Sequence, residues 1–551
     1  MFARSERYKM INRINKKKIG IEFDLIVIGG GINGSGIARD AAERGLKVLL
    51  IEKEDYSSGA TSASTRLIHG GLRYLEHFEF SLVRESLSER EFLLKQASHL
   101  VRPLKFCFPV YKTDKRKLWY LNIGMLFYEM LSLGKSLPGY KIISPKKVLR
   151  EEPSISDKDI SGLIVYYDAQ VQFPERLCLE NILMATNKGA ITLNHAKVES
   201  FQISENEIQS LTFIDKLTNN SYIVKAKQYV NASGPWVDTL CKNLKSNIKR
   251  KIGGTKGSHI IVRKFSSGPS NALLATAQSD GRPIFIIPWN NNYLIGTTDI
   301  HFDGDLDNVK VSYEEVNYLV SEANHVLKNY QITKDDILFT YSGVRPLPYV
   351  GNKAPASITR KHIISDHASD GINNMVSIIG GKLTTYRRLS EEVVDLIIRK
   401  LNIKHVSSKT LYEPLMGTPN ENYDDYKLKI VKKHLNKSDL DADILEHLLS
   451  IYGKKYKKIL DLVSQNPDMG KLISSSSLDI QAQIYYALEF EQAYTITDLF
   501  RRISLGLSSG LGEDAVPLVS DMLAKYYELS QEEINKQVED YFKSKELRIK
   551  N

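Results

Sequence analysis

The chain has 551 residues, of which 42% are hydrophobic and 25% charged, and it carries a net charge of +10 and three cysteines. This length exceeds what one hydrophobic core supports, so we expect two to four domains, and the composition argues against a disordered chain. The widely separated cysteines argue against a disulfide framework or a structural zinc site, and they suit a reducing compartment such as the cytoplasm.

The positive charge is concentrated in two segments. Residues 1–18 have a net charge of +6 and residues 102–147 a net charge of +8, which leaves the rest of the chain at −4. Such segments can indicate an anionic surface partner such as a lipid leaflet, although ordinary solvated charge gives the same pattern. We expect residues 1–21 to be a basic N-terminal extension that is not an ordinary secretory signal, and we expect no transmembrane helix anywhere.

The first globular element is a strand–helix–strand unit. Apolar runs and their spacing predict a buried strand at residues 24–30, a helix at 32–44 and a second strand at 47–52. Gly29, Gly31 and Gly34 form a GxGxxG turn between the first strand and the helix, and Glu52 ends the second strand. Such glycines allow a pyrophosphate to approach the backbone, and the carboxylate can accept hydrogen bonds from ribose hydroxyl groups. The unit therefore predicts a dinucleotide site.

Three later segments favour FAD over NAD. Small and hydroxylated residues at 61–65 precede His69-Gly70-Gly71, and residues 229–234 read as a strand that ends in small residues. Residues 378–385 read as a strand, a Gly-Gly turn and a helix start that could stabilise negative charge on a flavin ring. Each turn alone could be ordinary. Together they predict FAD contacts at Thr61, Ser62, Ser64, His69, Gly70, Gly234, Gly380, Gly381, Lys382, Leu383 and Thr384.

Residues 118–133, LWYLNIGMLFYEMLSL, are the most apolar segment. Twelve of the sixteen residues are apolar, and the three polar ones fall near one helical stripe. With the basic run 115–117 just before it, this helix could lie in a membrane interface, but a helix buried in the core gives the same pattern.

The rest of the chain predicts three kinds of structure. Residues 78–98 look like an amphipathic helix, residues 160–230 and 257–300 contain many strand-like runs with a helix near 175–188, and from about residue 410 only helices are expected. Ser530 and Glu533 form a capping box before the last helix. We therefore expect an α/β plus α fold. Its parts are a Rossmann-like FAD-binding domain (22–100, 175–255 and 366–405), a mixed β-sheet substrate domain (101–174 and 256–365) and a C-terminal helical domain (410–551).

Several segments together resemble a known family, the bacterial aerobic FAD-dependent glycerol-3-phosphate dehydrogenases, which have an amino-acid-oxidase-like FAD fold. The segments are GGGINGSGIARDAAERG, TRLIHGGLRYLE, KGSH, IPW, SGVRPL, ITRKH and GGKLTTYR. The resemblance is strong over residues 20–400 and weaker beyond, where residues 498–502, DLFRR, look like the family's terminal-domain signature. It implies oxidation of sn-glycerol 3-phosphate to dihydroxyacetone phosphate, with ubiquinone or menaquinone as the electron acceptor.

A phosphate dianion requires several cations that converge on one pocket, and arginine suits bidentate contact with phosphate. The positions that match the family's motifs, each beside a turn or strand end, are Arg73, Arg345, Arg360 and Lys382, to which Tyr74 could add a hydroxyl donor.

Oxidation of the alcohol also requires a general base. His259, in the KGSH segment, is the first choice because an imidazole can titrate near neutral pH. Lys382 could instead stabilise the alkoxide, and with Arg345 these residues form the expected catalytic set. His69 is expected to be a neighbour of the flavin.

Two enzymatic alternatives and one non-enzymatic alternative stay open from the sequence. A glycerol-3-phosphate oxidase that reduces O₂ to H₂O₂ would share nearly every motif, and an amino-acid or sarcosine-type flavin oxidase would have the same fold. The third is a binding or scaffold protein stabilised by FAD. We expect attachment to the inner face of the cytoplasmic membrane from the cytoplasm, an anionic membrane surface as partner, no metal and no nucleic-acid partner, and homodimerisation as an open option.

Overall fold

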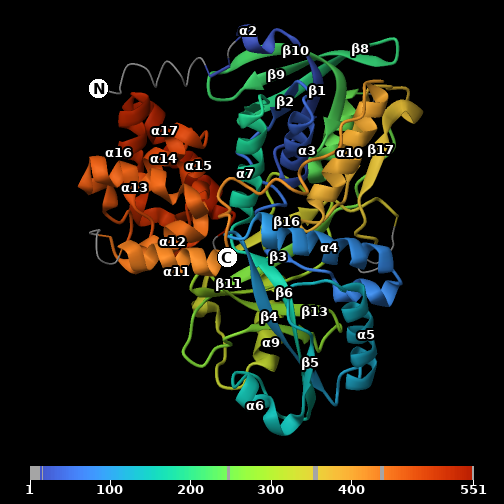
Figure 1. Ribbon diagram of the computed structural model, residues 1–551, viewed down its shortest axis with the longest axis vertical. Helices are drawn as coiled ribbons and strands as arrows, with labels where there is room; N and C mark the ends of the chain where they lie inside the picture. Colours follow the sequence, from blue (N-terminus) through green and yellow to red (C-terminus); the bar gives the residue numbers. More distant parts are fainter. Residues whose placement is uncertain (1–12, 15, 245–247, 352–357, 435–439, 549–551) are drawn as a thin grey trace.

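The computed structural model describes residues 13–14, 16–244, 248–351, 358–434 and 440–548. Figure 1 shows two β-sheets, one above the other along the long axis, with a group of helices coloured orange to red beside them. The chain combines α/β and all-helical parts, which confirms the predicted fold class. Among the described residues, no helix is both long enough and apolar enough to span a bilayer.

The first sheet has eight strands, and the central five of them run parallel. Its main path is β17 (Ile363–Asp366), β18 (Met375–Ile379), β10 (Asn220–Asn231), β1 (Glu22–Ile28), β2 (Val48–Ile51) and β7 (Ile191–Leu193), and β9 (Glu207–Asp215) and β8 (Ala196–Ser204) extend from β10. Ile28 of β1 lies beside Asn231 of β10 and Ile51 of β2. Because the carboxyl ends of parallel strands meet at one edge, the turns after β1, β2, β10 and β18 come together there.

Three helices form a shared hydrophobic core with this sheet: α3 (Ile32–Glu43), α7 (Pro174–Asn187) and α10 (Tyr386–Lys400). Ala38 and Ala41 of α3 are fully buried against Leu25 and Val27 of β1, since their small side chains let the helix lie close to the strands. The predicted strand–helix–strand unit is confirmed, with its ends shifted by one or two residues.

The second sheet has ten strands and is mixed, because β12 pairs parallel with β4 while its other pairs are antiparallel. Its main path is β15 (Ile300–His301), β11 (Thr255–Arg263), β14 (Asn292–Gly296), β13 (Pro283–Trp289), β12 (Ala272–Thr276), β4 (Val101–Tyr111), β6 (Ile160–Val171) and β3 (Leu67–Ile68), with β16 (Ile337–Arg345) on β11 and β5 (Lys141–Ile143) on β6. Segments of the two sheets alternate along the chain, and the exact domain boundaries stay a prediction.

Two groups of helices pack against the second sheet. One hydrophobic cluster contains α9 (Tyr313–Val326), and another contains α4 (Phe80–Gln96) and α5 (Leu118–Leu131). Short helical segments complete this part of the chain: α2 (Lys16–Ile19), η1 (Leu72–His77), η2 (Pro145–Lys147), α6 (Val148–Glu151), η3 (Gly234–Trp236), α8 (Val237–Leu244), η4 (Lys334–Asp336) and η6 (His367–Asp370).

The regular secondary structure of the C-terminal part is helical in the described residues, apart from one isolated bridge between Leu472 and Ile480. Its helices are α11 (Tyr423–His434), α12 (Ala442–Tyr452), η7 (Gly453–Lys455), α13 (Tyr456–Gln465), η8 (Pro467–Gly470), α14 (Gln481–Phe490), α15 (Ile496–Arg502), η9 (Leu505–Leu507), η10 (Ser509–Ala515), α16 (Val516–Tyr527) and α17 (Gln531–Glu546). The predicted capping box of Ser530 and Glu533 is present at α17.

The apolar segment 118–133 forms α5 and does not lie inside the core. Leu121, Met125 and Tyr128 face the second sheet, whereas Trp119, Leu126 and Met130 are half or more exposed. The interpretation as a core helix is therefore wrong for one face of α5, because the sheet covers only the narrow stripe around Met125.

Most of the basic N-terminal extension lies outside the described residues. Arg13, within it, donates two hydrogen bonds to Asp215, at 2.6 and 3.2 Å, and one to the backbone carbonyl of Asn194 at 2.7 Å. This part of the extension is fixed to the first sheet.

Candidate active site

The GxGxxG turn lies between β1 and α3, and two of its glycines are required by the protein's own packing. A Cβ on Gly29, whose φ is +112°, would lie 2.5 Å from the carbonyl oxygen of Ala232, and a Cβ on Gly34 would lie 1.9 Å from the carbonyl oxygen of Gly29. At Gly31 the nearest atom to such a Cβ is Oγ1 of Thr61, at 3.3 Å. The absence of a side chain at Gly31 therefore leaves backbone open on the side where a pyrophosphate is expected.

Glu52 holds this turn from the end of β2. Its Oε2 accepts a hydrogen bond from the N–H of Gly30 at 2.7 Å, and its Oε1 accepts one from the N–H of Glu54 at 2.9 Å. Burial raises the pKa of Glu52, and the two backbone donors offset only part of that effect. Each carboxylate oxygen keeps a further lone pair that a ribose hydroxyl group could use.

The later turns meet the first one at the same sheet edge. Oγ1 of Thr61 accepts a hydrogen bond from the N–H of Ile32 at 3.0 Å, in the first turn of α3. Nδ2 of Asn33 donates to the carbonyl of Gly380 at 3.4 Å, and its buried Oδ1 has no hydrogen-bond partner among the described residues. Gly380 and Gly381 both have positive φ, as the turn after β18 requires.

The helix expected after Gly380-Gly381 is present. The N–H of Thr385 bonds to the carbonyl of Lys382 at 3.1 Å and closes a tight turn, and Thr385 is the N-cap of α10, which starts at Tyr386. The reading of residues 378–385 as a strand, a Gly-Gly turn and a helix start is therefore confirmed. Lys382 contacts Ser86 of α4, and Thr384 contacts the backbone of His69.

Several of the other residues predicted to contact FAD already form hydrogen bonds within the protein. The Ser62 hydroxyl donates to the carbonyl of Gly59 at 3.1 Å, and the Ser64 hydroxyl accepts from the N–H of Arg66 at 3.3 Å. His69 donates its backbone N–H to Thr384 at 3.2 Å. Gly70 bonds to Tyr128 of α5 as described below, Gly234 has a φ of +60° and Leu383 is half-buried. Burial lowers the pKa of His69 to about 4, so its ring is neutral at neutral pH.

The predicted arginines Arg345 and Arg360 meet on one carboxylate. Nη1 of Arg345 donates to Oδ1 of Asp299 at 3.1 Å, and Nη2 of Arg360 donates to Oδ2 of Asp299 at 3.0 Å. Burial alone would raise the pKa of Asp299, but the two guanidinium groups hold it below its ordinary value. Two cations share one anion, so this end of the site has an excess of positive charge.

The two arginines differ in the number of hydrogen bonds that their guanidinium groups form within the protein. Nη2 of Arg345 also donates to Oγ1 of Thr297 at 3.0 Å, and a Cβ on Gly257 would lie 2.2 Å from the guanidinium, so these contacts fix the guanidinium against β11 while the side chain stays 29% exposed. Nη1 of Arg360 is buried and has no hydrogen-bond partner within the part of the chain that the structure describes.

Lys382 lies beside Tyr74 at another wall of the site. Its ammonium nitrogen lies 4.5 Å from the centre of the Tyr74 ring and donates to the hydroxyl of Ser86. Burial lowers the pKa of Lys382 to about 7, with Glu85 and Glu79 opposing the shift. The side chain of Arg73, also predicted to bind substrate, lies outside the described part of the chain.

His259 lies on β11, between β14 and β16. It is 1% exposed, and its ring stacks on Tyr341 with centroids 4.8 Å apart. Its Nε2 lies 2.9 Å from Oγ1 of Thr65, while its buried Nδ1 has no partner among the described residues. Burial lowers the pKa of His259 well below its ordinary value, and the nearby Arg345 and Arg66 lower it further. The imidazole is therefore neutral near pH 7.

The sequence analysis did not identify Asp299 or the pair of Arg66 and Glu175 as site residues. Arg66 is fully buried, forms two hydrogen bonds with Glu175 at 2.9 and 3.0 Å, and supports the stacked ring of Tyr341 by lying over it. Asp299 could have been proposed from its position, because it ends the GTTD segment just after β14 and functional side chains often follow strand ends.

Comparisons with known proteins agree over nearly the whole chain. The sequence profile described as FAD dependent oxidoreductase matches residues 24–387, and the profile described as the C-terminal domain of alpha-glycerophosphate oxidase matches residues 408–534.

Full-length relatives are similar in sequence and in structure. The chain is 45% identical over 535 residues to a glycerol-3-phosphate dehydrogenase of Synechocystis sp., covering 94% of this chain and 95% of the relative. It is 31% identical to an aerobic glycerol-3-phosphate dehydrogenase of Staphylococcus aureus, covering 96% and 95%. The crystal structure of the glycerol-3-phosphate dehydrogenase from Bacillus halodurans complexed with FAD superposes with a TM-score of 0.81 at 27% identity, covering 99% and 98%.

Proposed function

This chain belongs to the family of FAD-dependent oxidoreductases, and on that premise we propose that it oxidises sn-glycerol 3-phosphate to dihydroxyacetone phosphate. One observation carries the proposal: Arg345 and Arg360 share the single carboxylate of Asp299, which leaves an excess of cations beside the predicted flavin site. A phosphate dianion needs such an excess, whereas an amino-acid substrate with one carboxylate needs fewer cations.

FAD fits the edge of the first sheet. Gly29, Gly31, Gly34 and Glu52 would hold its pyrophosphate and ribose, and the unpartnered Oδ1 of Asn33 offers a buried acceptor beside the late turn. When bound, FAD supplies the two-electron acceptor for the alcohol. Gly31→Leu should abolish FAD retention although the protein's own atoms leave room at that position, and full FAD occupancy of this variant would contradict the assignment.

The chain's cations bind and orient the substrate. The unpartnered Nη1 of Arg360 is the donor best placed to take a phosphate oxygen, and Arg345 contributes charge from its fixed position. Lys382 and Tyr74 line the other wall, where they can hold the C2 oxygen. Arg73 belongs to the same proposed substrate set.

His259 is the proposed general base. Its lowered pKa keeps the imidazole unprotonated, so a ring nitrogen can take the proton of the C2 hydroxyl group. If Nε2–H donates to Thr65, the unpartnered Nδ1 is the accepting atom. A low pKa also makes the imidazole a weak base, and the ammonium of Lys382 offsets this by stabilising the alkoxide.

The test is spectroscopic. Purified protein should be yellow, and anaerobic sn-glycerol 3-phosphate should bleach the flavin absorbance, whereas glycerol and glycine should not. His259→Ala should retain FAD but bleach more slowly in a single turnover, by about a hundredfold or more. Bleaching by an amino acid and not by glycerol 3-phosphate would overturn the proposed substrate.

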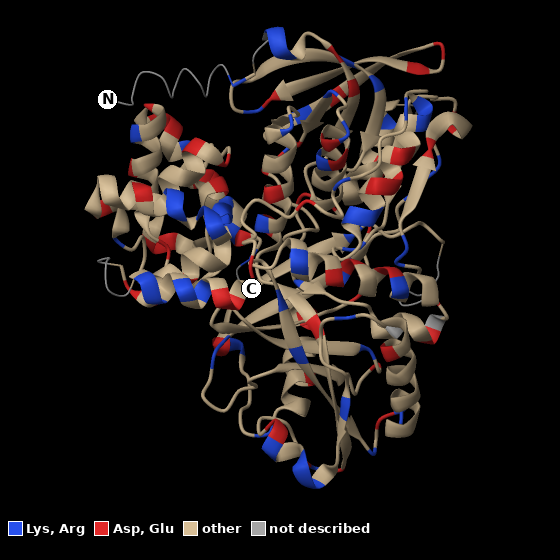
Figure 2. Cartoon of the chain, in the orientation of Figure 1, with Lys and Arg blue, Asp and Glu red and all other residues tan. Residues whose placement is uncertain are grey.

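The proposed electron acceptor is a membrane quinone, reached by peripheral attachment through α5. The outward face of α5 is apolar, and the helix is almost free of charge along its length (Figure 2). Trp119 is 66% exposed and Met130 62%, and Phe127 lies 6.4 Å, ring to ring, from the exposed Phe80 of α4. A contiguous exposed patch of this kind is typical of a membrane or protein contact.

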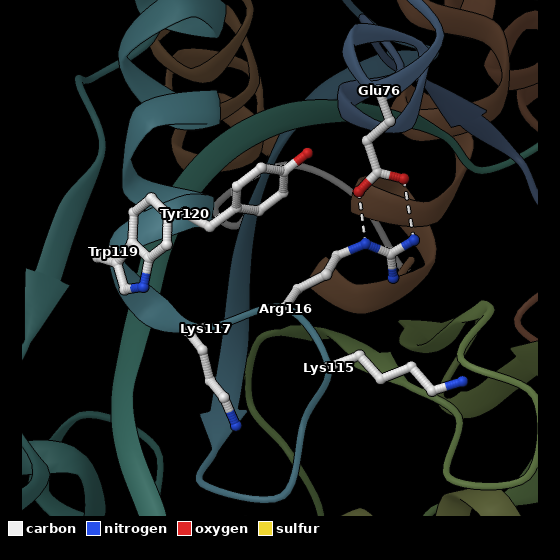
Figure 3. A pocket seen from close by; sticks show the side chains of 6 residues that line it. All are labelled: Glu76, Lys115, Arg116, Lys117, Trp119 and Tyr120. Carbon is white, nitrogen blue, oxygen red and sulfur yellow. Dashed lines mark hydrogen bonds and ion pairs between the residues drawn. The ribbon is translucent and has the colours of Figure 1, made fainter.

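Basic residues at the start of α5 favour the membrane over a second copy of the chain. Lys115 and Lys117 flank a groove of about 440 Å³ with Trp119 and Tyr120, while Arg116 is paired with Glu76 (Figure 3). Lys115 and Lys117 have no carboxylate partner among the described residues. A homodimer through this patch would bring like charges together, whereas anionic lipid headgroups complement them.

The inner side of α5 reaches the candidate active site. The hydroxyl of Tyr128 accepts a hydrogen bond from the N–H of Gly70 at 3.0 Å, and it donates to Asp168 at 2.9 Å. Gly70 follows His69, so the buried face of α5 is hydrogen-bonded to a segment that is predicted to contact the flavin. This proximity supports electron delivery to an acceptor dissolved in the membrane.

Flotation with vesicles tests the attachment. The parent should float with anionic vesicles at low salt, and a variant with both Leu126→Ser and Phe127→Ser should float less at unchanged FAD content. A parent that stays wholly in the soluble fraction would contradict membrane attachment at the inner face of the cytoplasmic membrane.

A glycerol-3-phosphate oxidase is the second candidate, favoured by the match of residues 408–534 to the oxidase-named C-terminal domain. The two functions differ only in the electron acceptor. Stoichiometric H₂O₂ during turnover in air, without reduction of added quinone, would favour the oxidase.

A further inference from the structure

The C-terminal helical domain has no role in the chemistry proposed above, yet residues 491–502 contact the loop that holds the GxGxxG turn. We propose that this domain keeps the FAD-binding turn in its binding conformation, and that Arg502 is the positioning residue through which it acts. The proposal rests on the proposed binding of FAD.

The loop after β2 secures Gly30 from both sides. Glu52 accepts the N–H of Gly30 at 2.7 Å, and the N–H of Ser57 donates to the carbonyl of Gly30 at 3.0 Å. The ring of Tyr56 lies against Gly30, where a Cβ would meet it at 2.8 Å. Any displacement of residues 52–57 would therefore displace the turn expected to receive the pyrophosphate.

The helical domain in turn fixes that loop. Arg502 donates to both carboxylate oxygens of Asp55, at 2.6 and 2.8 Å, and its Nε donates to the carbonyl of Glu491 at 3.0 Å. The hydroxyl of Tyr56 donates to Oε1 of Gln492 at 2.7 Å. Two adjacent residues of the loop are thus held by two neighbouring segments of the helical domain.

A second contact lies beside the first. Nε2 of His195 lies 2.9 Å from Asp498, and the N–H of His195 donates to the carbonyl of Glu54 at 2.8 Å. Asp55, His195 and Asp498 are close enough to one another to resemble a metal site. Arg502 already binds both oxygens of Asp55, so the cluster is better explained as an ion-pair network that joins the domain to the loop.

Burial makes this contact sensitive to geometry. Asp55 and Tyr56 are each 1% exposed and Arg502 is 2% exposed. Two buried charges are favourable only in a well-formed hydrogen-bonded pair, and loss of one partner leaves the other charge unpaired. Without Arg502, the carboxylate of Asp55 would move toward water and take the loop with it.

The test measures the dissociation constant of FAD from the full-length chain by the recovery of free-flavin fluorescence. Arg502→Met should raise this constant tenfold or more. Lys455→Met is the matched control, because Lys455 forms another largely buried ion pair between the helical domain and α7, with Glu180 at 3.0 Å. In the described part of the chain this pair forms no hydrogen bond or ion pair with residues 52–57 or 491–502. The control should bind FAD as the parent does.

Tyr56→Phe provides a milder variant that keeps the ring against Gly30 and removes only the bond to Gln492. It should raise the dissociation constant about fivefold, the usual effect of one lost hydrogen bond. At saturating FAD, both variants should be bleached by sn-glycerol 3-phosphate at nearly the parent rate, because the substrate residues are untouched.

The outcomes separate this inference from the proposed function. If the folded Arg502→Met protein, or the Tyr56→Phe protein where Arg502→Met does not fold, binds FAD within twofold of the parent, the positioning role is wrong. An equal weakening by Lys455→Met would also overturn it, since attachment of the domain in general would then be the cause. A parent that binds no FAD at all would overturn the proposed function as well.

Discussion

Two groups of arginines in this molecule, one buried and one partly exposed, differ in how their charge is balanced. Between the helical domain and the first sheet, Arg502 is matched by Asp55, and Arg176 is matched by Glu491 at 2.6 and 2.7 Å. In the candidate active site, Arg345 and Arg360 share Asp299 alone. One group is neutral in total, and the other has a surplus positive charge.

The difference separates structural arginines from ligand-binding ones. A bidentate pair with one cation for each carboxylate satisfies both ions and leaves little for a ligand to bind. A shared carboxylate leaves donors such as Nη1 of Arg360 without a partner, and a buried unpartnered donor is unfavourable until an anion arrives. We therefore expect the matched group to govern stability and the unmatched group to govern substrate binding.

The largest expected effect is on stability, at a matched pair. Arg176→Met leaves Glu491 buried and unpaired, which should lower the free energy of unfolding by about 3–5 kcal/mol. The measurement is a urea unfolding curve followed by circular dichroism. Lys525→Ala, which breaks an exposed pair with Asp521, is the control and should change it by less than about 0.5 kcal/mol. Equal losses from the two changes would contradict the distinction.

The next largest effect is on turnover, at the unmatched group. Arg360→Ala should lower kcat/KM for sn-glycerol 3-phosphate by about ten- to a hundredfold, the effect of one lost charged hydrogen bond. Because Asp299 keeps Arg345, the unfolding curve and the FAD content should stay as in the parent. Arg345→Ala should lower kcat/KM at least as much.

Arg388, whose side chain is 45% exposed on α10, provides the control for these two variants. Arg388→Ala should leave kcat/KM unchanged. If Arg360→Ala destabilises the protein and spares kcat/KM, the surplus charge has no role in substrate binding.

The sequence could predict those features of this molecule that depend only on residues close together in the chain. The strand–glycine turn–helix unit and the capping box at Ser530 follow from short-range steric and hydrogen-bonding demands, and both were found as expected. The arginines were identified through motifs. What the sequence could not predict is which acid each arginine would meet, because Arg345 and Asp299 are brought together by the antiparallel pairs of β11, not by their spacing in the chain.

The same limit explains what the sequence left open. The turn after β18 and the start of α10 follow the local pattern of residues 378–385, but the contact of Lys382 with Ser86 of α4 joins segments that are far apart in the chain. The buried stripe of α5 was ambiguous in sequence, since a face covered by a sheet and a face covered by lipid have the same composition. Only the position of the second sheet decides which face is exposed.

Two residues near these groups, Lys382 in the candidate active site and His195 at the domain contact, should respond differently to pH. Burial lowers the pKa of Lys382 to about 7, so the free enzyme loses this cation as the pH rises through 7. KM for sn-glycerol 3-phosphate should rise about fivefold from pH 7 to pH 8, because the protonated fraction of a group with this pKa falls from about one half to about one eleventh. Lys382→Arg should remove this dependence, and a parent KM that is flat from pH 6 to 8 would contradict it.

His195, which lies beside the matched pair of Arg502 and Asp55, should affect stability at alkaline pH. Burial alone would lower the pKa of His195, but the pair with Asp498 raises it, and Asp55 and Arg13 also face this ring. Its contribution to stability is therefore complete below about pH 6.5, the ordinary value, and is lost as the pH rises through the raised one. His195→Gln should flatten the fall in the free energy of unfolding at alkaline pH.

The smallest expected effect for a single side chain is at the surface, where Lys115 and Lys117 have no carboxylate partner among the described residues but are solvated. Water already stabilises these charges, so they gain only the attraction of an anionic leaflet, about 1 kcal/mol for each lysine at low salt. Changing both to glutamine should therefore weaken binding to anionic vesicles by about ten- to thirtyfold and leave the weak, apolar binding to zwitterionic vesicles as it was.

The matched control is the change of Lys432 and Lys433 to glutamine, since these are exposed lysines on α11, in the helical domain. If the two double variants lose the same affinity, net charge and not the position beside α5 determines attachment. If neither double variant loses affinity, the apolar face of α5 binds the membrane without help from the lysines. An unpartnered cation in this molecule would then indicate a binding site only where it is buried.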